Sequence, residues 1–241
     1  MKLSTLIKQI PKNLIDIFLP AYCFNCKELL KDNRKIICSE CFSCLPEVTR
    51  DQHKVFLERM PETHFDNLII LYEFSQLFRQ IMYYYKYQGY IEIAEYFAQS
   101  SINKLELHYD LVSFVPLHPT KLRERGFNQS ALIAEKLCKI RGLELHPDLI
   151  KRTRYTKSQT KLNRNKRREN VKNAFELTED VNEKNILFID DVITTGATVN
   201  ECAGMFKKAN AKRVDIIAMA TPTDVLQSKL ESNDSDLLIL T

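Results

Sequence analysis

Two adjacent aspartates stand between a short apolar stretch and a run of small residues. Residues 186–189 are Ile-Leu-Phe-Ile, Asp190 and Asp191 follow, and the run consists of Thr194, Thr195, Gly196, Ala197 and Thr198. Glycine and small hydroxylated residues let backbone N–H groups approach a phosphate, and a helix starting here adds the positive end of its dipole. Two carboxylates suit ribose hydroxyls or hydrated Mg²⁺. An ordinary helix cap needs only one such residue, so the pattern predicts a ribose 5-phosphate site.

Five of the seven cysteines lie between positions 23 and 44. Cys23 and Cys26 form one C-x-x-C pair, Cys38 and Cys41 form another, and eleven residues separate them. Two such pairs can place four thiolates tetrahedrally around Zn²⁺. Cys44 stands three residues after Cys41, so Cys38 or Cys44 can complete the site, and we choose Cys38 because it gives the more symmetric pairs. A redox-active pair is the competing interpretation, but the surroundings do not look thioredoxin-like.

A basic segment precedes the aspartates in the chain. Residues 151–172 contain ten Lys or Arg residues and a single acid, Glu169, whereas the whole chain has a formal net charge of only +4. This concentration of charge indicates a polyanionic ligand or partner, with a solvated loop as the common alternative.

The overall composition limits the class of protein. A length of 241 residues suits one full domain and a small accessory module. No stretch reaches the roughly 20 apolar residues that a membrane helix needs. Lys8, Lys12 and Asp16 interrupt the N-terminal apolar residues, and no small-residue cleavage site follows, so a signal peptide is not expected. We expect a cytoplasmic protein that is not an integral membrane protein, and in that reducing compartment crowded cysteines indicate metal.

Hydrophobic periodicity predicts the elements that position these motifs. Apolar residues between Leu3 and Phe18 recur at helical spacing and predict an amphipathic helix that docks on the body of the protein. Helices are expected over 76–87, 91–107, 128–141 and 198–210, and strands over 67–74, 110–115, 143–150, 185–189 and 214–220. The alternation predicts an α/β fold with a parallel sheet flanked by helices, which binds ligands at the carboxyl ends of its strands.

A second candidate anion loop spans residues 115–129. It contains Lys121, Arg123 and Arg125, which could reach a pyrophosphate, and Asn128, which could cap the next helix. His118 lies in a proline-framed turn, and we interpret it as structural.

In the order of its motifs the sequence resembles the ComF family of competence proteins, within the type I phosphoribosyltransferase superfamily. The cysteine pairs come first, Lys86-Tyr-Gln-Gly89 follows, and then residues 122–129, Leu-Arg-Glu-Arg-Gly-Phe-Asn-Gln. The aspartates close the series, after Arg152, Gln159, Leu162, Arg167, Asn170, Ala174 and Phe175. The resemblance covers about residues 14–220.

The resemblance implies a type I phosphoribosyltransferase-like fold preceded by a four-cysteine zinc module. It implies that Asp190 and Asp191 bind the ribose hydroxyls of phosphoribosyl pyrophosphate (PRPP) with Mg²⁺, and that residues 194–198 cradle its 5′-phosphate. Lys86 and Arg125 are the further ligand-binding residues that we expect. The implied organisation is a helix (1–18), a zinc module (19–65), a phosphoribosyltransferase-like domain (66–221) and a tail (222–241).

Membership of this family implies a role in natural transformation, in which the protein handles incoming single-stranded DNA. The basic segment then becomes a lid over PRPP that also contacts DNA phosphates, with Tyr155 as a stacking face. The expected DNA-binding residues are Arg152, Arg154, Lys157, Lys161, Arg164, Lys166, Arg167 and Arg168. The DNA-uptake or recombination machinery near the inner membrane is a further expected partner.

Two other functions stay open from the sequence. One is a working phosphoribosyltransferase that acts on a base or a nucleic-acid acceptor, and the other is a scaffold whose PRPP site is a relic. No catalytic residue is assigned, because no base-recognition region is identifiable. A glutaminase activity is not expected, since it needs an N-terminal cysteine nucleophile and Lys2 follows Met1 here.

Overall fold

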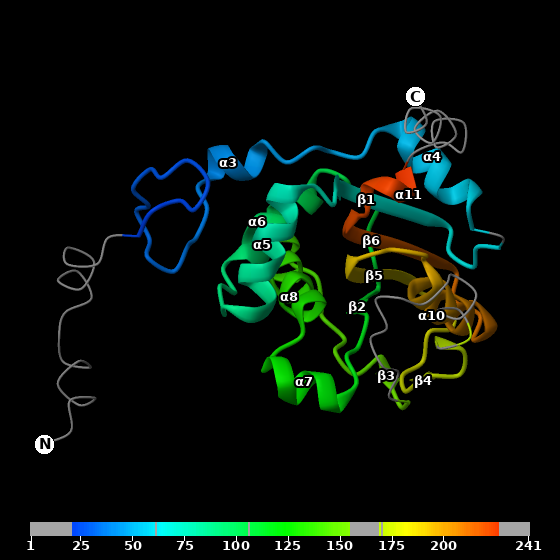
Figure 1. Ribbon diagram of the computed structural model, residues 1–241. Coiled ribbons are helices and arrows are strands. Elements are labelled where there is room, and N and C mark those ends of the chain that lie inside the picture. The colour runs from blue at the N-terminus through cyan, green and yellow to red at the C-terminus, as the bar shows by residue number, and fades with distance from the viewer. Residues whose placement is uncertain (1–20, 61, 106, 155–168, 170, 227–241) are drawn as a thin grey trace, which may run out of the picture.

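The computed structural model of the protein describes residues 21–60, 62–105, 107–154, 169 and 171–226. Its central sheet has four parallel strands in the order β1-β6-β5-β2 (Figure 1). The strands are β1 (Asn67–Glu73), β2 (Leu111–Phe114), β5 (Asn185–Val192) and β6 (Arg213–Thr221). The central strands β5 and β6 are nearly continuous buried runs, because a parallel sheet of this kind is covered on both faces. A separate antiparallel pair consists of β3 (Ile150–Arg152) and β4 (Phe175–Leu177).

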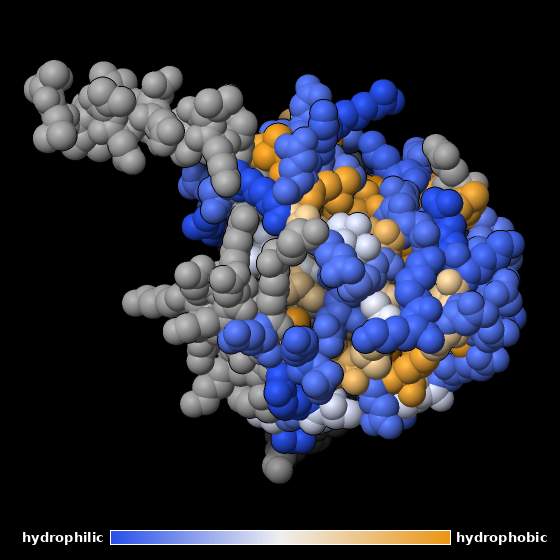
Figure 2. All heavy atoms as spheres, turned by 90° about the vertical axis from the view of Figure 1, so that its right-hand side faces the viewer, coloured by the Kyte–Doolittle hydropathy of each residue, from blue (hydrophilic) through white to orange (hydrophobic). Residues whose placement is uncertain are grey.

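Helices cover both faces of the sheet (Figure 1). Alternate residues of β5 serve two cores: Leu187 and Ile189 pack with one set of helices, and Ile186 and Phe188 with the other. The first set is α5 (Gln76–Tyr87), α6 (Ile93–Ile102) and α8 (Gln129–Arg141). The second set is α4 (Arg50–Glu58), α10 (Ala197–Lys208) and α11 (Thr223–Leu226). The face that carries α4 and α10 is mostly hydrophilic, with small hydrophobic areas between the polar side chains (Figure 2).

Local sequence signals set the ends of α8. Asn128 is its N-cap: the side-chain oxygen accepts from the N–H groups of Ser130 and Ala131, and its Nδ2 donates to the carbonyl of Val115 at 2.9 Å. Gly142 ends the helix in the left-handed conformation. The cap therefore ties α8 to the segment that follows β2, at the carboxyl edge of the sheet.

The expected fold class, a parallel α/β sheet behind a cysteine module, is confirmed, but several expected elements are wrong in detail. Residues 143–150 are not a strand apart from Ile150, since only Leu145 makes an isolated bridge. The helix expected over 91–107 is the shorter α6, and the anion loop at 115–129 contains a helix, α7 (Pro119–Arg125). The strand expected to end at Ile189 continues to Val192. The helix expected at 1–18 lies outside the described residues.

The cysteine module, residues 21–46, packs on α5 and α6 and has no separate core. Cys23, Ile37 and Phe42 are buried in the same apolar cluster as the α5 and α6 side chains. The Phe42 ring stacks on Tyr96 with centroids 4.8 Å apart, and the Tyr96 hydroxyl donates to the carbonyl of Ile37 at 3.0 Å. The module, which includes the short helix α3 (Ser39–Ser43), is therefore seated on the body beside the sheet (Figure 1).

Among the described residues, no helix is both long and apolar enough to span a membrane.

Candidate functional site

The carboxyl edge of the sheet carries Asp190 and Asp191. We name these two residues, together with residues 192–199, the aspartate edge. Strand β2 ends at Phe114, opposite Ile189, whereas β6 continues beside β5 as far as Val192. Both aspartates thus project beyond the end of β2 while their backbone stays fixed by β6. The aspartates are part of the strand and not of the turn after it, so their positions are set by the sheet.

Asp191 faces α5. Its Oδ2 lies 2.5 Å from Nζ of Lys86 at the C-terminal end of that helix, and both side chains are largely buried. Burial raises the pKa of Asp191, but the charge and hydrogen bond of Lys86 outweigh that effect and hold the pKa below its ordinary range. The pair therefore fixes an ionised carboxylate at the edge of the sheet.

Asp190 is more deeply enclosed. Its Oδ1 accepts the N–H of Asp191 at 2.8 Å and the hydroxyl of Ser130, the second residue of α8, at 3.4 Å. Burial raises the pKa of Asp190 well above its ordinary value, and the charge of Asp191 adds to the rise. The two carboxylates thus have pKa values pushed in opposite directions, and a bound cation would favour the ionised form of both.

The turn after β5 is built for close approach of a ligand. Gly196 is the N-cap of α10 and has a φ of +69°, and a Cβ added there would lie 2.6 Å from Cε of Met60. A small cavity of about 50 Å³ is lined by Asp190 and residues 192–199. The first-turn N–H groups of a helix lack partners within the helix and point toward its N-terminal end. These residues therefore fit a phosphate group with an adjacent ribose.

Positive side chains surround the aspartate edge on the side of α7. Arg125 lowers the pKa of Asp191 and donates from Nη1 to Oε1 of Gln129 at 3.1 Å. Burial lowers the pKa of Lys121, and the charges of Arg152 and Arg125 lower it further. Lys121 thus lies close enough to Arg125 and to Arg152 to be repelled by both, and this grouping of cations suits an anion with several charges such as a pyrophosphate.

The described part of the basic segment contains two of the predicted DNA-binding residues. Arg152 is partly buried, and its guanidinium lies 5.3 Å from the ring centroid of Phe175. Arg154 is exposed, and its Nη2 donates to the carbonyl of Lys172 at 2.8 Å. The other predicted contacts lie outside the described residues: Lys157, Lys161, Arg164, Lys166, Arg167 and Arg168.

Four cysteine sulfurs of the module converge. Those of Cys23, Cys26, Cys38 and Cys41 all lie within 4.8 Å of one another, whereas Cys44 is exposed and is not in the group. The Cys26 and Cys38 sulfurs are 3.7 Å apart, close to the separation of about 3.8 Å that tetrahedral zinc–sulfur bonds require. The donor set fits Zn²⁺, which when bound would crosslink the two pairs and so hold the module in shape.

Sequence reasoning missed two residues that contact the aspartate edge. Ser130 is the second residue of α8, and only the packing of α8 beside β5 brings its hydroxyl to Asp190. Met60 reaches Gly196 from the segment after α4, more than a hundred positions earlier in the chain. Neither residue type carries a signal by itself.

Comparisons with known proteins agree with this geometry. The family described as phosphoribosyl transferase domain matches residues 125–240. Competence protein F of Haemophilus influenzae is 33% identical over 44% of this chain and 48% of its own, and DNA utilization protein YhgH of Escherichia coli O157:H7 is 37% identical over 44% and 47%. Competence protein ComFC of Streptococcus pneumoniae is 26% identical over 81% of this chain and 80% of its own.

The fold is therefore of the phosphoribosyltransferase type, and residues 125–240 match that domain family. Within that class the chain is similar to competence protein F, to DNA utilization protein YhgH and to competence protein ComFC. The matches to the first two relatives span about half of those relatives' length.

Proposed function

We propose that this protein is a cytoplasmic competence factor that binds PRPP with Mg²⁺ at the aspartate edge and handles incoming single-stranded DNA. The observation that carries the PRPP site is the pairing of Lys86 with Asp191 beside a glycine turn that opens α10. An ion-paired carboxylate, a buried carboxylate and a helix N-terminus together suit a ribose, a divalent cation and a phosphate. The DNA function is supported by the names of the relatives, which mention competence and DNA utilization.

In this proposal the residues of the chain bind and orient. Asp190 and Asp191 accept hydrogen bonds from ribose hydroxyls or coordinate the cation, and the first turn of α10 donates to the 5′-phosphate. Lys121 and Arg125 face the pyrophosphate. The cation, when bound, neutralises charge on the phosphates, and zinc in the cysteine module has a structural role.

Calorimetric titration of PRPP–Mg²⁺ into the wild type and into the Asp190→Ala/Asp191→Ala double variant tests the site. Heat should be released by the wild type and be absent in the variant, because the variant lacks both carboxylates. Asp148→Asn is the matched control, since that carboxylate is 73% exposed and lies outside the aspartate edge. Equal heats from the wild type and the double variant would contradict the site assignment. A transformation assay of the same variant then shows whether the site serves DNA uptake.

A working phosphoribosyltransferase is the second candidate function, and one observation favours it. A cavity of about 310 Å³ adjoins the phosphate turn and is lined by Thr195 and Ala197 together with His64, Asn200 and Glu201. The Asn200 side chain is already bonded to the N–H of His64 and the carbonyl of Glu62. An acceptor base beside the ribose would therefore be bound by the His64 ring and the Glu201 carboxylate. Release of pyrophosphate that depends on an added base would establish this activity, whereas PRPP binding without turnover would favour the handling factor.

A further inference from the structure

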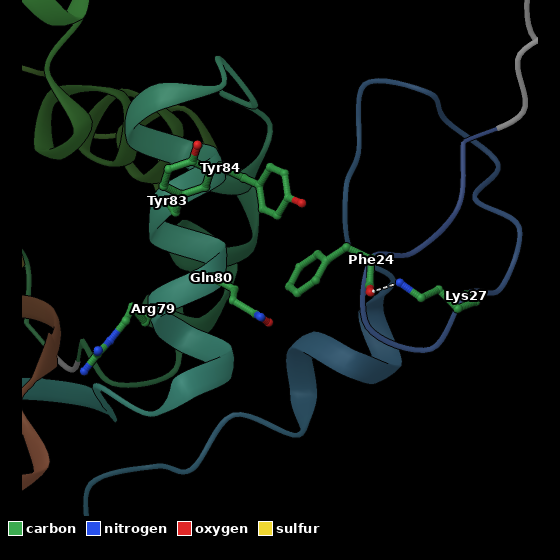
Figure 3. Close-up of a pocket in the computed structure, with 6 residues that line it drawn as sticks. All are labelled: Phe24, Lys27, Arg79, Gln80, Tyr83 and Tyr84. Carbon is green, nitrogen blue, oxygen red and sulfur yellow. Dashed lines mark hydrogen bonds between the residues drawn. The ribbon is translucent and has the colours of Figure 1, made fainter.

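A groove of about 550 Å³ lies between helix α5 and the cysteine module, beside the residues that join them (Figure 3). It lies outside the aspartate edge and the basic segment. Tyr84 and Gln80 extend from α5 toward Phe24 of the module across the groove (Figure 3). The residues that line it are Phe24, Lys27, Arg79, Gln80, Tyr83 and Tyr84.

The apolar surface of the groove is aromatic. The Phe24 and Tyr84 rings are 5.3 Å apart between centroids, and Tyr83 follows Tyr84 at 5.8 Å. Tyr83 is 52% exposed, so its ring is presented to the solvent and is not part of the core. An amphipathic helix lays a continuous apolar face into a hydrophobic groove, whereas an exposed ring such as Tyr83 offers a flat face on which a nucleic-acid base stacks.

The charged side chains of the groove are both positive. They are Lys27 of the module and Arg79 of α5, and no carboxylate lines the groove among the residues that the structure describes. Lys27 Nζ donates to the carbonyl of Phe24 at 2.7 Å, whereas Arg79 extends from α5 on the side away from Phe24, with its guanidinium 5.7 Å from the Phe74 ring centroid (Figure 3). Arg79, Tyr83 and Tyr87 stand four residues apart along α5, and all three are exposed, so they form one stripe on the helix. Cations next to exposed rings match a polyanion that carries bases, and they match an acidic peptide less well because it offers no bases to stack.

Helix α5 connects the groove to the aspartate edge. The Tyr83 and Tyr87 rings are 5.8 Å apart, and the guanidinium of Arg125 lies 5.9 Å from the Tyr87 ring centroid. Lys86, the neighbour of Tyr87, holds Asp191. A strand that follows the stripe thus runs from the cysteine module to the ribose and phosphate site.

We propose that this groove binds single-stranded DNA, with bases stacked on Phe24, Tyr83 and Tyr84 and phosphates beside Lys27 and Arg79. The inference rests on the DNA-handling function proposed above and assigns it a surface separate from the basic segment. It gives the cysteine module a role in recognition, because the module supplies one wall of the groove.

Fluorescence anisotropy with a labelled oligothymidine of about 16 nucleotides tests the stacking faces. Tyr83→Ala should weaken binding about fivefold or more, because loss of the ring on which one base stacks has an effect of that size. Tyr22→Ala is the matched control: this tyrosine is 54% exposed, lies on the same module and does not line the groove. Both variants should keep the wild-type zinc content and melting temperature, since both rings are exposed.

The double variant Lys27→Gln/Arg79→Gln tests the two cations of the groove. Its control is Lys139→Gln, a change at an exposed lysine of α8. The double variant should lower the salt slope of binding by about 0.7 for each DNA phosphate that the protein no longer neutralises. An abasic strand should respond to the double variant but not to Tyr83→Ala, because it has phosphates without bases.

The outcomes separate the two proposals. If the wild type does not bind the oligonucleotide, the DNA-handling function itself fails. If the wild type binds but Tyr83→Ala and Tyr22→Ala behave alike, the groove proposal is overturned while DNA handling stands, and a protein segment becomes the expected occupant of the groove.

Discussion

The aspartate edge and the groove share helix α5 but are built from different parts of the chain. The backbone of the edge comes from one continuous segment, the end of β5 and the start of α10, and β6 fixes it, while Lys86, Ser130 and Met60 contact it from other segments. The groove is formed by side chains from two segments, and the cysteine module supplies one wall, with Phe24 and Lys27. A site made by backbone within a sheet should withstand loss of the module, whereas a site made between two segments should not.

Removal of metal from the cysteine module should have the largest effect and should separate the two sites. Structural zinc contributes about 10–16 kcal/mol of apparent binding free energy in small modules, so Cys41→Ser should unfold the module and abolish the groove. We expect DNA affinity to fall to the level left by the basic segment, while PRPP heats persist. Zinc content, anisotropy and calorimetry on the same preparation measure this.

Cys44→Ser is the control for that experiment, because Cys44 is exposed and outside the cluster. It should retain zinc and both ligands. Loss of PRPP binding in Cys41→Ser would show that the two sites are not independent.

The pH dependence of stability should sharpen the description of the aspartate edge. The pKa of Asp190 lies above its ordinary value of 3.8, so above that value the folded protein holds a proton that the unfolded chain has lost. The free energy of unfolding should therefore fall by about 1.4 kcal/mol for each unit of pH increase. This fall ends when the pH passes the raised pKa of Asp190. Asp191 has a lowered pKa, so its stabilisation is lost only on acidification below 3.8.

Urea unfolding of the wild type and of Asp190→Asn across this window measures the effect. The variant should show a flatter dependence on pH, and the exposed-site control Asp148→Asn should follow the wild type. Parallel curves for Asp190→Asn and the wild type would mean that the burial of Asp190 has no energetic consequence.

The smallest expected effect concerns the glycine turn. Gly196 and Gly142 have φ values of +69° and +65°, but a Cβ would meet Met60 only at Gly196 and has open space at Gly142. Changing either glycine to Ala should cost about 1 kcal/mol of stability because of the left-handed backbone. Only Gly196→Ala should also weaken the binding of PRPP, since the ligand approaches that turn. Thermal melts and calorimetry measure both quantities, and equal PRPP affinities in the two variants would contradict a phosphate cradle at Gly196.

The sequence predicted the elements that depend on local patterns. Helix α5 has the expected bounds, and Asn128 caps α8 as expected, because periodicity and capping are encoded within a few residues. The strand expected over 143–150 is wrong because only Leu145 bridges to β2, at Val112, and the segment does not pair along a ladder. Apolar content alone does not distinguish a strand from a buried connection.

By itself the sequence determined the paired aspartates, the small-residue turn and the two cysteine pairs, since each depends on spacing within a short segment. Tertiary structure decided that Lys86 faces Asp191, that Ser130 and Met60 complete the aspartate edge, and that Cys38 joins the cluster and Cys44 does not. It also decided that Phe24 and Tyr83 line one groove. Such pairings depend on how distant segments pack, and packing responds to the whole apolar core, so no local pattern specifies them.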